Sequence, residues 1–253
     1  MLYFGQFNIL KTKITACDYD WIIETIFKNL NNKFVVAPLA SHPLTLAYLD
    51  KNNQRILDAI DIIVPDSQYV RWALRLLYDV NLKERVYGPE LLLKICSMAQ
   101  KEERKIYFIG NKLGILMRSF KKKFPSLRIT GYIDLQYKPI SDELIKKIDN
   151  EIKTSNPELI FIGIGSPSQH KLAVEMQANR PIICVGAAFD FVSGLKKQAP
   201  KWMQKWGLEW FFRLTTEPLI LWKRYFIYGT LFLFFIIIFA YKKLLNNFIR
   251  RRI

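Results

Sequence analysis

This sequence is poor in residues that bind metals or form covalent cross-links. Its 253 residues include three cysteines, at positions 17, 96 and 184, and no CxxC pair. Its two histidines, His42 and His170, have no partner at metal-ligand spacing. These absences argue against a disulfide framework and against a structural metal site. We therefore expect neither a metal nor another cofactor.

Acidic residues are also scarce. The chain has 22 Asp and Glu against 38 Lys and Arg, a formal net charge of +16. From Lys196 onward, twelve basic residues stand against Glu209 and Glu217, a net charge of +10 over 58 residues. Such an excess favours a polyanionic partner. Nucleic acid would account for this charge but not for the apolar run within it, so we expect no nucleic-acid partner.

The N-terminus has no basic stretch followed by a long apolar run, so it does not resemble a secretory signal, and we expect the body of the chain to stay in the cytoplasm. Near the other end, Tyr225–Tyr241 holds 17 uncharged residues. As a helix it would be about 26 Å long, the lower limit for spanning a bilayer. Lys223 and Arg224 precede it, Lys242 and Lys243 follow, and tyrosines stand at both margins, as at a membrane interface. The pattern predicts membrane insertion and leaves open whether the helix crosses or lies shallow.

Short β-rich runs alternate with amphipathic stretches along the first 195 residues. We expect strands at Lys33–Pro38, Asp61–Val64, Lys105–Ile109, Arg128–Tyr132, Leu159–Gly163 and Pro181–Val185. We expect helices at Asp18–Leu30, His42–Asp50, Gln68–Tyr78, Pro89–Gln100, Leu113–Phe124, Asp142–Thr154 and Ser168–Gln177. Strands separated by helices of this length predict an α/β, Rossmann-like fold with a mainly parallel sheet flanked by helices.

In such sheets, ligands bind beyond the carboxyl ends of the strands, and Asp66 stands at one of these ends. It follows the apolar run ending at Val64 and precedes the helix predicted over Gln68–Tyr78. Its carboxylate could cap that helix, or it could act as a general base on an incoming hydroxyl. The residues around it leave these two roles about even.

A second strand end reads GIGSPSQ, residues 163–169. Gly163 and Gly165 would let backbone amides approach a phosphate, next to the positive end of the following helix. The alternative is structural: Ser166 would be the N-cap of that helix and Gln169 would complete a capping box. The GxGS pattern is weak because it matches neither established phosphate-binding glycine motif.

A third strand end reads VGAAFDF, residues 185–191. Its small residues permit close approach of a ligand or of another element. Asp190 between two phenylalanines could bind a ligand or could cap the next turn, and the pattern leaves both readings open.

The longest distinctive segment is GAAFDFVSGLKKQAPKWMQKWGLEWFFRLTTEP, Gly186–Pro218, supported by VPDS at 64–67, ERVYGPEL at 84–91 and GIGSPSQ at 163–169. On these segments the sequence resembles the bacterial WecG/TagA/CpsF family, glycosyltransferase family 26, from about Lys33 to Tyr225. The resemblance implies transfer of a sugar from a UDP-sugar donor to a polyprenyl-diphosphate-linked saccharide, with inversion and without a metal. It places the enzyme at the cytoplasmic face of the bacterial inner membrane, in cell-surface or exopolysaccharide synthesis. N-acetylmannosamine, its uronic acid or another hexose are the candidate sugars.

The resemblance also assigns roles to individual residues. Asp66 matches the proposed general base. Arg85 matches an arginine near the donor, and Gln169 matches a polar residue of the same pocket. Asp190 is expected near the nucleotide.

Two basic residues of the C-terminal part, Arg213 and Arg224, match arginines thought to close over the donor diphosphate. A guanidinium suits this role because its fork pairs with phosphate oxygens and stays charged. We expect the diphosphate near the Gly163–Ser166 turn. Trp202, Trp206 and Trp210 follow at helical spacing, either as core or as an interfacial anchor.

The chain departs from the family pattern at three single positions, and its segment EPLILWKRY, residues 217–225, lacks the arginines that are common after EP. Ala37 and Leu39 replace a frequent Thr and Asn around a proline, and His170 replaces a frequent Glu after Gln169. These changes put the donor sugar in doubt more than the reaction class.

We therefore expect a catalytic domain over residues 1–195, a basic amphipathic appendage over 196–224, a membrane segment over 225–241 and a basic tail over 242–253. Partners would be the UDP-sugar, the lipid-linked acceptor and membrane lipids, with a homo-oligomer left open. The alternative is a non-catalytic, membrane-associated nucleotide-binding or scaffold protein of a polysaccharide assembly.

Overall fold

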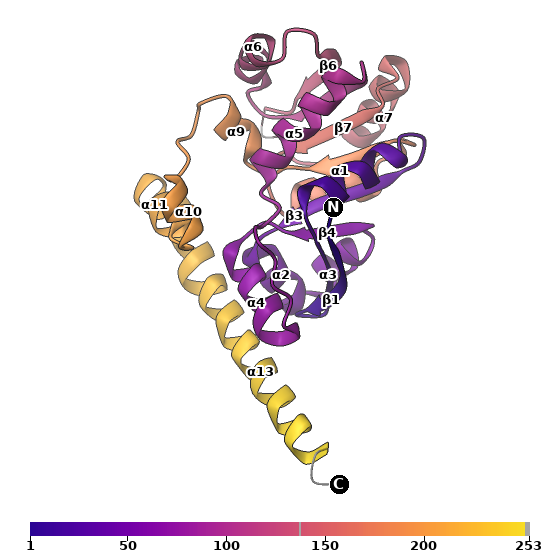
Figure 1. The fold of residues 1–253 in the computed structure, drawn as a ribbon. Coiled ribbons are helices and arrows are strands. Elements are labelled where there is room, and N and C mark those ends of the chain that lie inside the picture. Colours follow the sequence, from indigo (N-terminus) through magenta and orange to yellow (C-terminus); the bar gives the residue numbers. More distant parts are fainter. Residues whose placement is uncertain (137, 251–253) are drawn as a thin grey trace.

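In a computed structural model, which describes residues 1–136 and 138–250 (side chains to 246), a parallel sheet forms the centre of the molecule (Figure 1). Its six strands lie in the order β4-β3-β8-β7-β5-β6, and every neighbouring pair is parallel. The strands are β3 (Phe34–Leu39), β4 (Ile62–Pro65), β5 (Lys105–Gly110), β6 (Arg128–Asp134), β7 (Leu159–Gly163) and β8 (Pro181–Cys184). The predicted α/β class is confirmed.

Two helical layers cover the sheet, which explains why its central strands read as unbroken apolar runs. One face packs against α1 (Tyr19–Lys28), α5 (Gly88–Lys101), α6 (Leu113–Lys123) and the short α9 (Ala188–Val192). The other packs against α2 (Ser41–Leu49), α3 (Lys51–Asp58), α4 (Gln68–Tyr78), α7 (Asp142–Ser155) and α8 (Ser168–Glu175). Ile160, Phe161 and Ile183 are fully buried between the layers.

The N-terminus forms a hairpin that sequence reasoning missed. Strands β1 (Tyr3–Ile9) and β2 (Thr12–Cys17) pair antiparallel around Leu10 and Lys11, whose φ angles are 49° and 68°. Two consecutive positive φ values suit the tight turn of a twisted hairpin. Alternation of apolar and polar residues from Gln6 to Ile9 was the available signal. Helix α3 was also missed.

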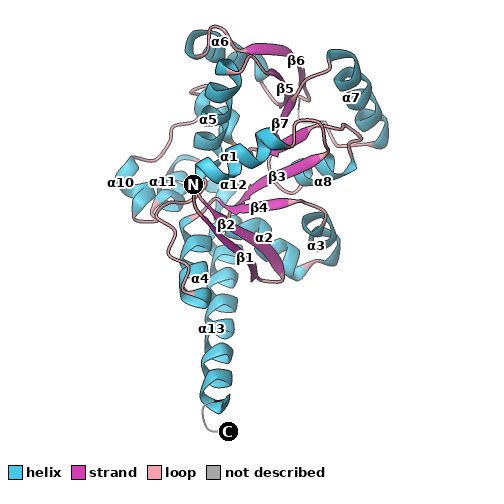
Figure 2. Cartoon of the chain, turned by 45° about the vertical axis from the view of Figure 1, so that its right-hand side comes forward, coloured by secondary structure: helices cyan, strands magenta, loops and turns pink. Residues whose placement is uncertain are grey.

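After β8 and α9, the chain leaves the sheet and forms a series of short helices followed by one long helix (Figure 2). These are α10 (Lys201–Lys205), α11 (Glu209–Thr216), α12 (Pro218–Trp222), the π-helix η1 (Lys223–Gly229) and α13 (Thr230–Arg250). Residues Pro218–Asn246 are long and apolar enough to cross a membrane. The predicted tail begins inside α13, and its residues 251–253 lie outside the described part.

The tryptophan stripe expected on one helical face does not exist as such. Gly207, at φ 74°, separates α10 from α11, so Trp202 and Trp210 belong to different helices. Trp202 is 60% exposed and Trp206 is 72% exposed. The core-packing interpretation is therefore wrong for these two residues.

Candidate active site

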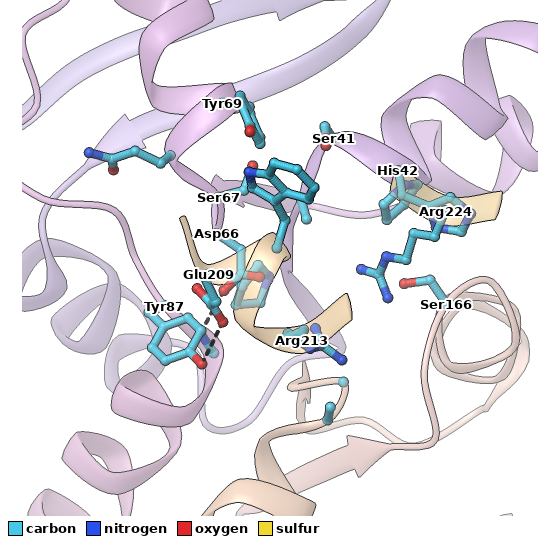
Figure 3. Close-up of a pocket in the computed structure, with 18 of the residues that line it drawn as sticks. Ser41, His42, Asp66, Ser67, Tyr69, Tyr87, Ser166, Glu209, Arg213 and Arg224 are labelled. Carbon is cyan, nitrogen blue, oxygen red and sulfur yellow. Dashed lines mark hydrogen bonds between the residues drawn. The ribbon is translucent and has the colours of Figure 1, made fainter. Parts of the chain in front are cut away.

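A cavity of about 380 Å³ opens at the carboxyl ends of the central strands (Figure 3). The loops after β3, β4, β7 and β8 form one wall, and α11, η1 and the start of α13 form the other. Seven of the nine residues predicted for the site line this cavity, namely Asp66, Arg85, Gly165, Ser166, Gln169, Arg213 and Arg224.

Asp66 is held at the end of β4 by its own backbone and side chain. Its N–H donates to the carbonyl of Leu39 (3.0 Å), and its Oδ1 accepts from the N–H of Gly88 (2.8 Å). Ser67, not Asp66, caps α4, because its hydroxyl accepts from the Val70 N–H (3.3 Å). The helix-cap interpretation of Asp66 is therefore wrong, and among the described residues nothing donates to its Oδ2.

The surroundings of Asp66 raise the pKa of its carboxyl above the ordinary value. Burial is the main cause, and the charge of Glu209 adds to it; Arg85, the Gly88 N–H and Arg224 act in the opposite direction. A carboxylate with a raised pKa accepts a proton more readily, which suits a general base that works near neutral pH.

Arg85 links this carboxylate to the C-terminal helices. Its guanidinium pairs with Glu209 of α11 (2.6 Å), and both side chains are mostly buried, with 12% and 14% exposed. The Tyr87 hydroxyl donates to the other oxygen of Glu209 (3.0 Å), and Arg85 lies over the Tyr87 ring, 4.2 Å from its centroid. Burial works against the Arg85 charge, but Glu209 and Asp66 outweigh it and raise the pKa.

Sequence reasoning counted Glu209 only as one of two acids in a basic segment. The scarcity of acids, two among twelve basic residues, was the available signal.

The loop after β7 contributes backbone and an amide side chain. Gly165, at φ 87°, and Ser166 line the cavity. The predicted capping box is wrong, because α8 starts at Ser168 and its N-cap position, Pro167, makes no side-chain bond. Instead, Oε1 of Gln169 accepts from the Gly186 N–H (3.0 Å) and so ties the loop after β7 to the loop after β8.

Two predicted residues lie outside the cavity lining. A Cβ built on Gly163 would stand 2.4 Å from the ring of Phe189, so this glycine makes room for a phenylalanine rather than for a phosphate. Asp190 lies within α9 and pairs with Lys196 (3.2 Å), which also reaches Glu217 (2.9 Å). The N-cap of α9 is Ala187, so the capping interpretation of Asp190 is wrong as well.

Arg213 and Arg224 bring positive charge to the cavity from α11 and η1. No described acidic side chain forms an ion pair with either one, so both are available to an anion. Burial, followed by repulsion from Arg213, lowers the pKa of Arg224. An anion bound between these guanidiniums would relieve that repulsion.

His42 lines the same cavity and was missed as a site residue. Its ring stands edge-on to Tyr228 (4.9 Å), and its Nδ1 is buried without a described hydrogen-bond partner. Burial, with a contribution from Arg224, lowers its pKa to about 3, so the imidazole is neutral at working pH.

The three family departures lie away from the cavity lining. Ala37 and Leu39 are fully buried in the core, while Pro38 between them lines the cavity. His170 is 1% exposed, and its Nε2 lies 3.1 Å from Nε2 of Gln169, so a buried hydrogen bond between the two side chains helps to fix the position of Gln169.

A carboxylate at a strand end shares a cavity with two arginines that pair with no acid in the described part of the chain, and this arrangement suits an enzyme that transfers a group between phosphate-bearing substrates. Among the described residues, no group of three or more His, Cys, Asp or Glu side chains could hold a metal ion. The sequence model of the WecG/TagA/CpsF family of glycosyl transferases matches residues 7–246, and the protein belongs to this family. It is therefore a glycosyltransferase, as the resemblance predicted.

Curated relatives include two N-acetylglucosaminyldiphosphoundecaprenol N-acetyl-β-D-mannosaminyltransferases. The one from Bacillus subtilis (strain 168) is 29% identical over 184 residues, which cover 70% of this chain and 69% of the relative. The one from Staphylococcus aureus (strain MRSA252) is 28% identical over 240 residues, covering 86% and 87%. The residues that the family model matches, 7–246, include the C-terminal helices as well as the sheet.

Proposed function

We propose that this protein transfers a sugar from a UDP-sugar to a polyprenyl-diphosphate-linked saccharide, with inversion, without a metal and with Asp66 as general base. The observation that carries the proposal is that Asp66 shares one cavity with Arg213 and Arg224. The names of the relatives supply the acceptor class, a sugar on undecaprenyl diphosphate. N-acetylmannosamine is the first donor sugar to test, followed by its uronic acid and other hexoses.

The chemistry needs one proton acceptor and one stabilised leaving group. The acceptor sugar's hydroxyl loses its proton to Asp66, and its oxygen attacks the anomeric carbon of the donor. The bond from that carbon to the donor diphosphate breaks, and UDP leaves with the electron pair. A single displacement of this kind inverts the anomeric centre.

Arg213 and Arg224 are the groups that neutralise the departing diphosphate in this proposal. Developing charge on a leaving group is best stabilised by fixed donors in a site with little water. Both arginines are held in helices that close one side of the cavity. Gly165 and Ser166 stand on the other side, where backbone can approach a phosphate.

The substrates also constrain where the enzyme works. A UDP-sugar is water-soluble, and the polyprenyl chain of the acceptor stays in a bilayer, so the cavity must open beside a membrane. This supports a position at the cytoplasmic face of the inner membrane, where the exposed Trp202 and Trp206 would contact lipid.

The test supplies membranes containing the full chain with UDP-sugars and polyprenyl-diphosphate acceptors, and measures UDP release together with lipid-linked product. Asp66→Asn is expected to lose at least 100-fold in kcat, because an amide cannot take the proton. The matched control is Asp79→Asn, at the exposed end of α4, which should keep full activity. Full turnover by Asp66→Asn would refute the mechanism, and no turnover by the unaltered protein with any donor would favour the scaffold alternative. A chelator should leave the rate unchanged if no metal takes part.

A further inference from the structure

Helix α13 packs beside α2 and α4 along its first half, and its second half projects beyond the catalytic domain (Figures 1 and 2). Phe232 and Ile236 are 1% and 4% exposed and belong to the core that covers one face of the sheet. Phe235 packs against Tyr48 of α2, with ring centroids 4.8 Å apart. About two turns further along α13 than Ile236, the Lys243 ammonium donates to the carbonyl of Leu77 at the end of α4. The docked face therefore extends over several turns, from Phe232 to Lys243.

The opposite face of the same helix is apolar and exposed. Phe234, Ile237, Tyr241 and Leu244 recur at i, i+3, i+7 and i+10, and each has more than half of its surface exposed. Before α13, the short helix α12 also exposes large apolar side chains, namely Leu219, Ile220 and Trp222. A helix with one face in a protein core and the other face this apolar needs a second, apolar partner.

The docked arrangement leaves too little helix to span a bilayer. Tyr225, Phe226, Gly229, Thr230 and Leu233 line the cavity, so this part of the apolar run belongs to the active-site wall. Eight uncharged residues, 234–241, remain before Lys242. They cover about 12 Å as a helix, against the roughly 30 Å of a hydrocarbon core.

If α13 spanned a bilayer, the helices of the catalytic domain next to it would also enter the hydrocarbon. Helix α4 presents the exposed Arg75 and Asp79, and α3 begins with the exposed Lys51. Charged side chains of this kind are costly within hydrocarbon and are rare on surfaces that face lipid.

The residues around the exposed stripe suit a bilayer surface. Lys223 and Lys242 are exposed on the same stretch of chain, and Trp222 and Tyr241 stand close to them. Aromatic side chains with a polar edge settle at the headgroup level, and lysines are attracted to anionic headgroups.

We propose that α12 to α13 form an in-plane membrane helix: the face that carries Phe234, Ile237, Tyr241 and Leu244 lies in one leaflet, and both ends of the chain stay on one side. The catalytic cavity, whose wall this helix completes, then opens at the membrane surface. The proposal concerns the geometry of attachment, and it does not depend on which sugar is transferred.

Cysteine labelling distinguishes an in-plane helix from a spanning one. The three native cysteines are buried, so a membrane-impermeant maleimide should not label the unaltered chain. Asn246→Cys places a thiol near the end of α13, and Thr154→Cys places one on α7, on the catalytic domain; both positions are exposed. In intact cells and in inverted vesicles, the two thiols should always be labelled from the same side. Labelling from opposite sides would overturn the proposal.

An acidic substitution on the exposed apolar stripe of α13 tests whether the partner of this stripe is a membrane. Ile237→Glu should weaken binding of the full chain to vesicles of phosphatidylglycerol and phosphatidylethanolamine by about tenfold or more, since an exposed isoleucine that would enter the leaflet is replaced by an acid. Thr154→Glu adds the same charge on the far helix α7 and should leave binding unchanged. If Ile237→Glu binds vesicles normally but converts an oligomer to a monomer, the stripe contacts a second copy of the chain and the proposal is wrong.

Discussion

Removing the charge of Glu209 tests whether the Arg85–Glu209 ion pair holds the C-terminal helices over the cavity. In Glu209→Gln, the amide oxygen can still accept from the Tyr87 hydroxyl, so size and one hydrogen bond are kept. What is lost is the countercharge 2.6 Å from the Arg85 guanidinium, in a place where both side chains are mostly buried. Arg85 is then left with Asp66 as its remaining acidic neighbour.

Breaking a buried pair by removing one partner costs about 3–5 kcal/mol. Because Asp66 still compensates part of the charge, we expect a loss of about 2–3 kcal/mol, at or below the low end of that range. For a protein of this size, that corresponds to a drop in Tm of about 4–12 °C. The double variant Arg85→Gln/Glu209→Gln should lose less than the sum of the two single variants, by about 1 kcal/mol or more, because neither charge is left unpaired.

The assays are thermal unfolding and trypsin cleavage at Lys197, in the exposed loop that connects α9 to α10. Faster cleavage without global unfolding would show that the C-terminal helices open separately. The control is Glu24→Gln, which removes the exposed pair Glu24–Lys28 and should change stability by less than about 0.5 kcal/mol. If Glu209→Gln behaves like this control in both assays, the ion pair does not hold the helices and the reasoning fails.

Three further outcomes follow from the site. The acid limb of the pH profile of kcat/KM should move to lower pH in Glu209→Gln and to higher pH in Arg85→Gln, because Glu209 raises and Arg85 lowers the pKa of the proposed base; an unmoved limb in both variants would contradict that assignment. Arg224→Gln should lower kcat by about 100-fold with a smaller effect on stability, since the positive charge at the leaving group is lost; an unchanged kcat would remove Arg224 from the mechanism. Gly163→Ala should lower the free energy of unfolding by about 1–3 kcal/mol, because the added Cβ meets the Phe189 ring, and adding Phe189→Leu should restore stability. The KM for the donor should stay unchanged in both variants. A rise in KM without a loss of stability would show that Gly163 does contact the donor phosphate.

Strand-end positions were predictable from the sequence because parallel strands place their carboxyl ends on one edge of a sheet. Asp66, Gly165, Ser166 and Gln169 were found in this way, and all four line the cavity. The local roles assigned to them were less reliable. Capping depends on which residue adopts the N-cap conformation, and the chain uses Ser67 where Asp66 was also possible.

Glu209 and His42 could not be found by the same reasoning. Each takes its role from an element distant in sequence: Glu209 pairs with Arg85, 124 residues away, and His42 stands against Tyr228 of η1. Such contacts depend on how the C-terminal helices return over the sheet, and no local pattern encodes that path.

For the apolar segment too, one part of the description follows from the sequence and another only from the tertiary structure. The sequence by itself determined that residues 225–241 form an uncharged stretch between basic clusters, since hydropathy and charge are properties of the side chains alone. Only the tertiary structure decided which face of this helix stays exposed. Its first part lines the active-site cavity and Phe232 and Ile236 fill the core, so packing against α2 and α4 has already used one side of a helix that its composition makes apolar all round.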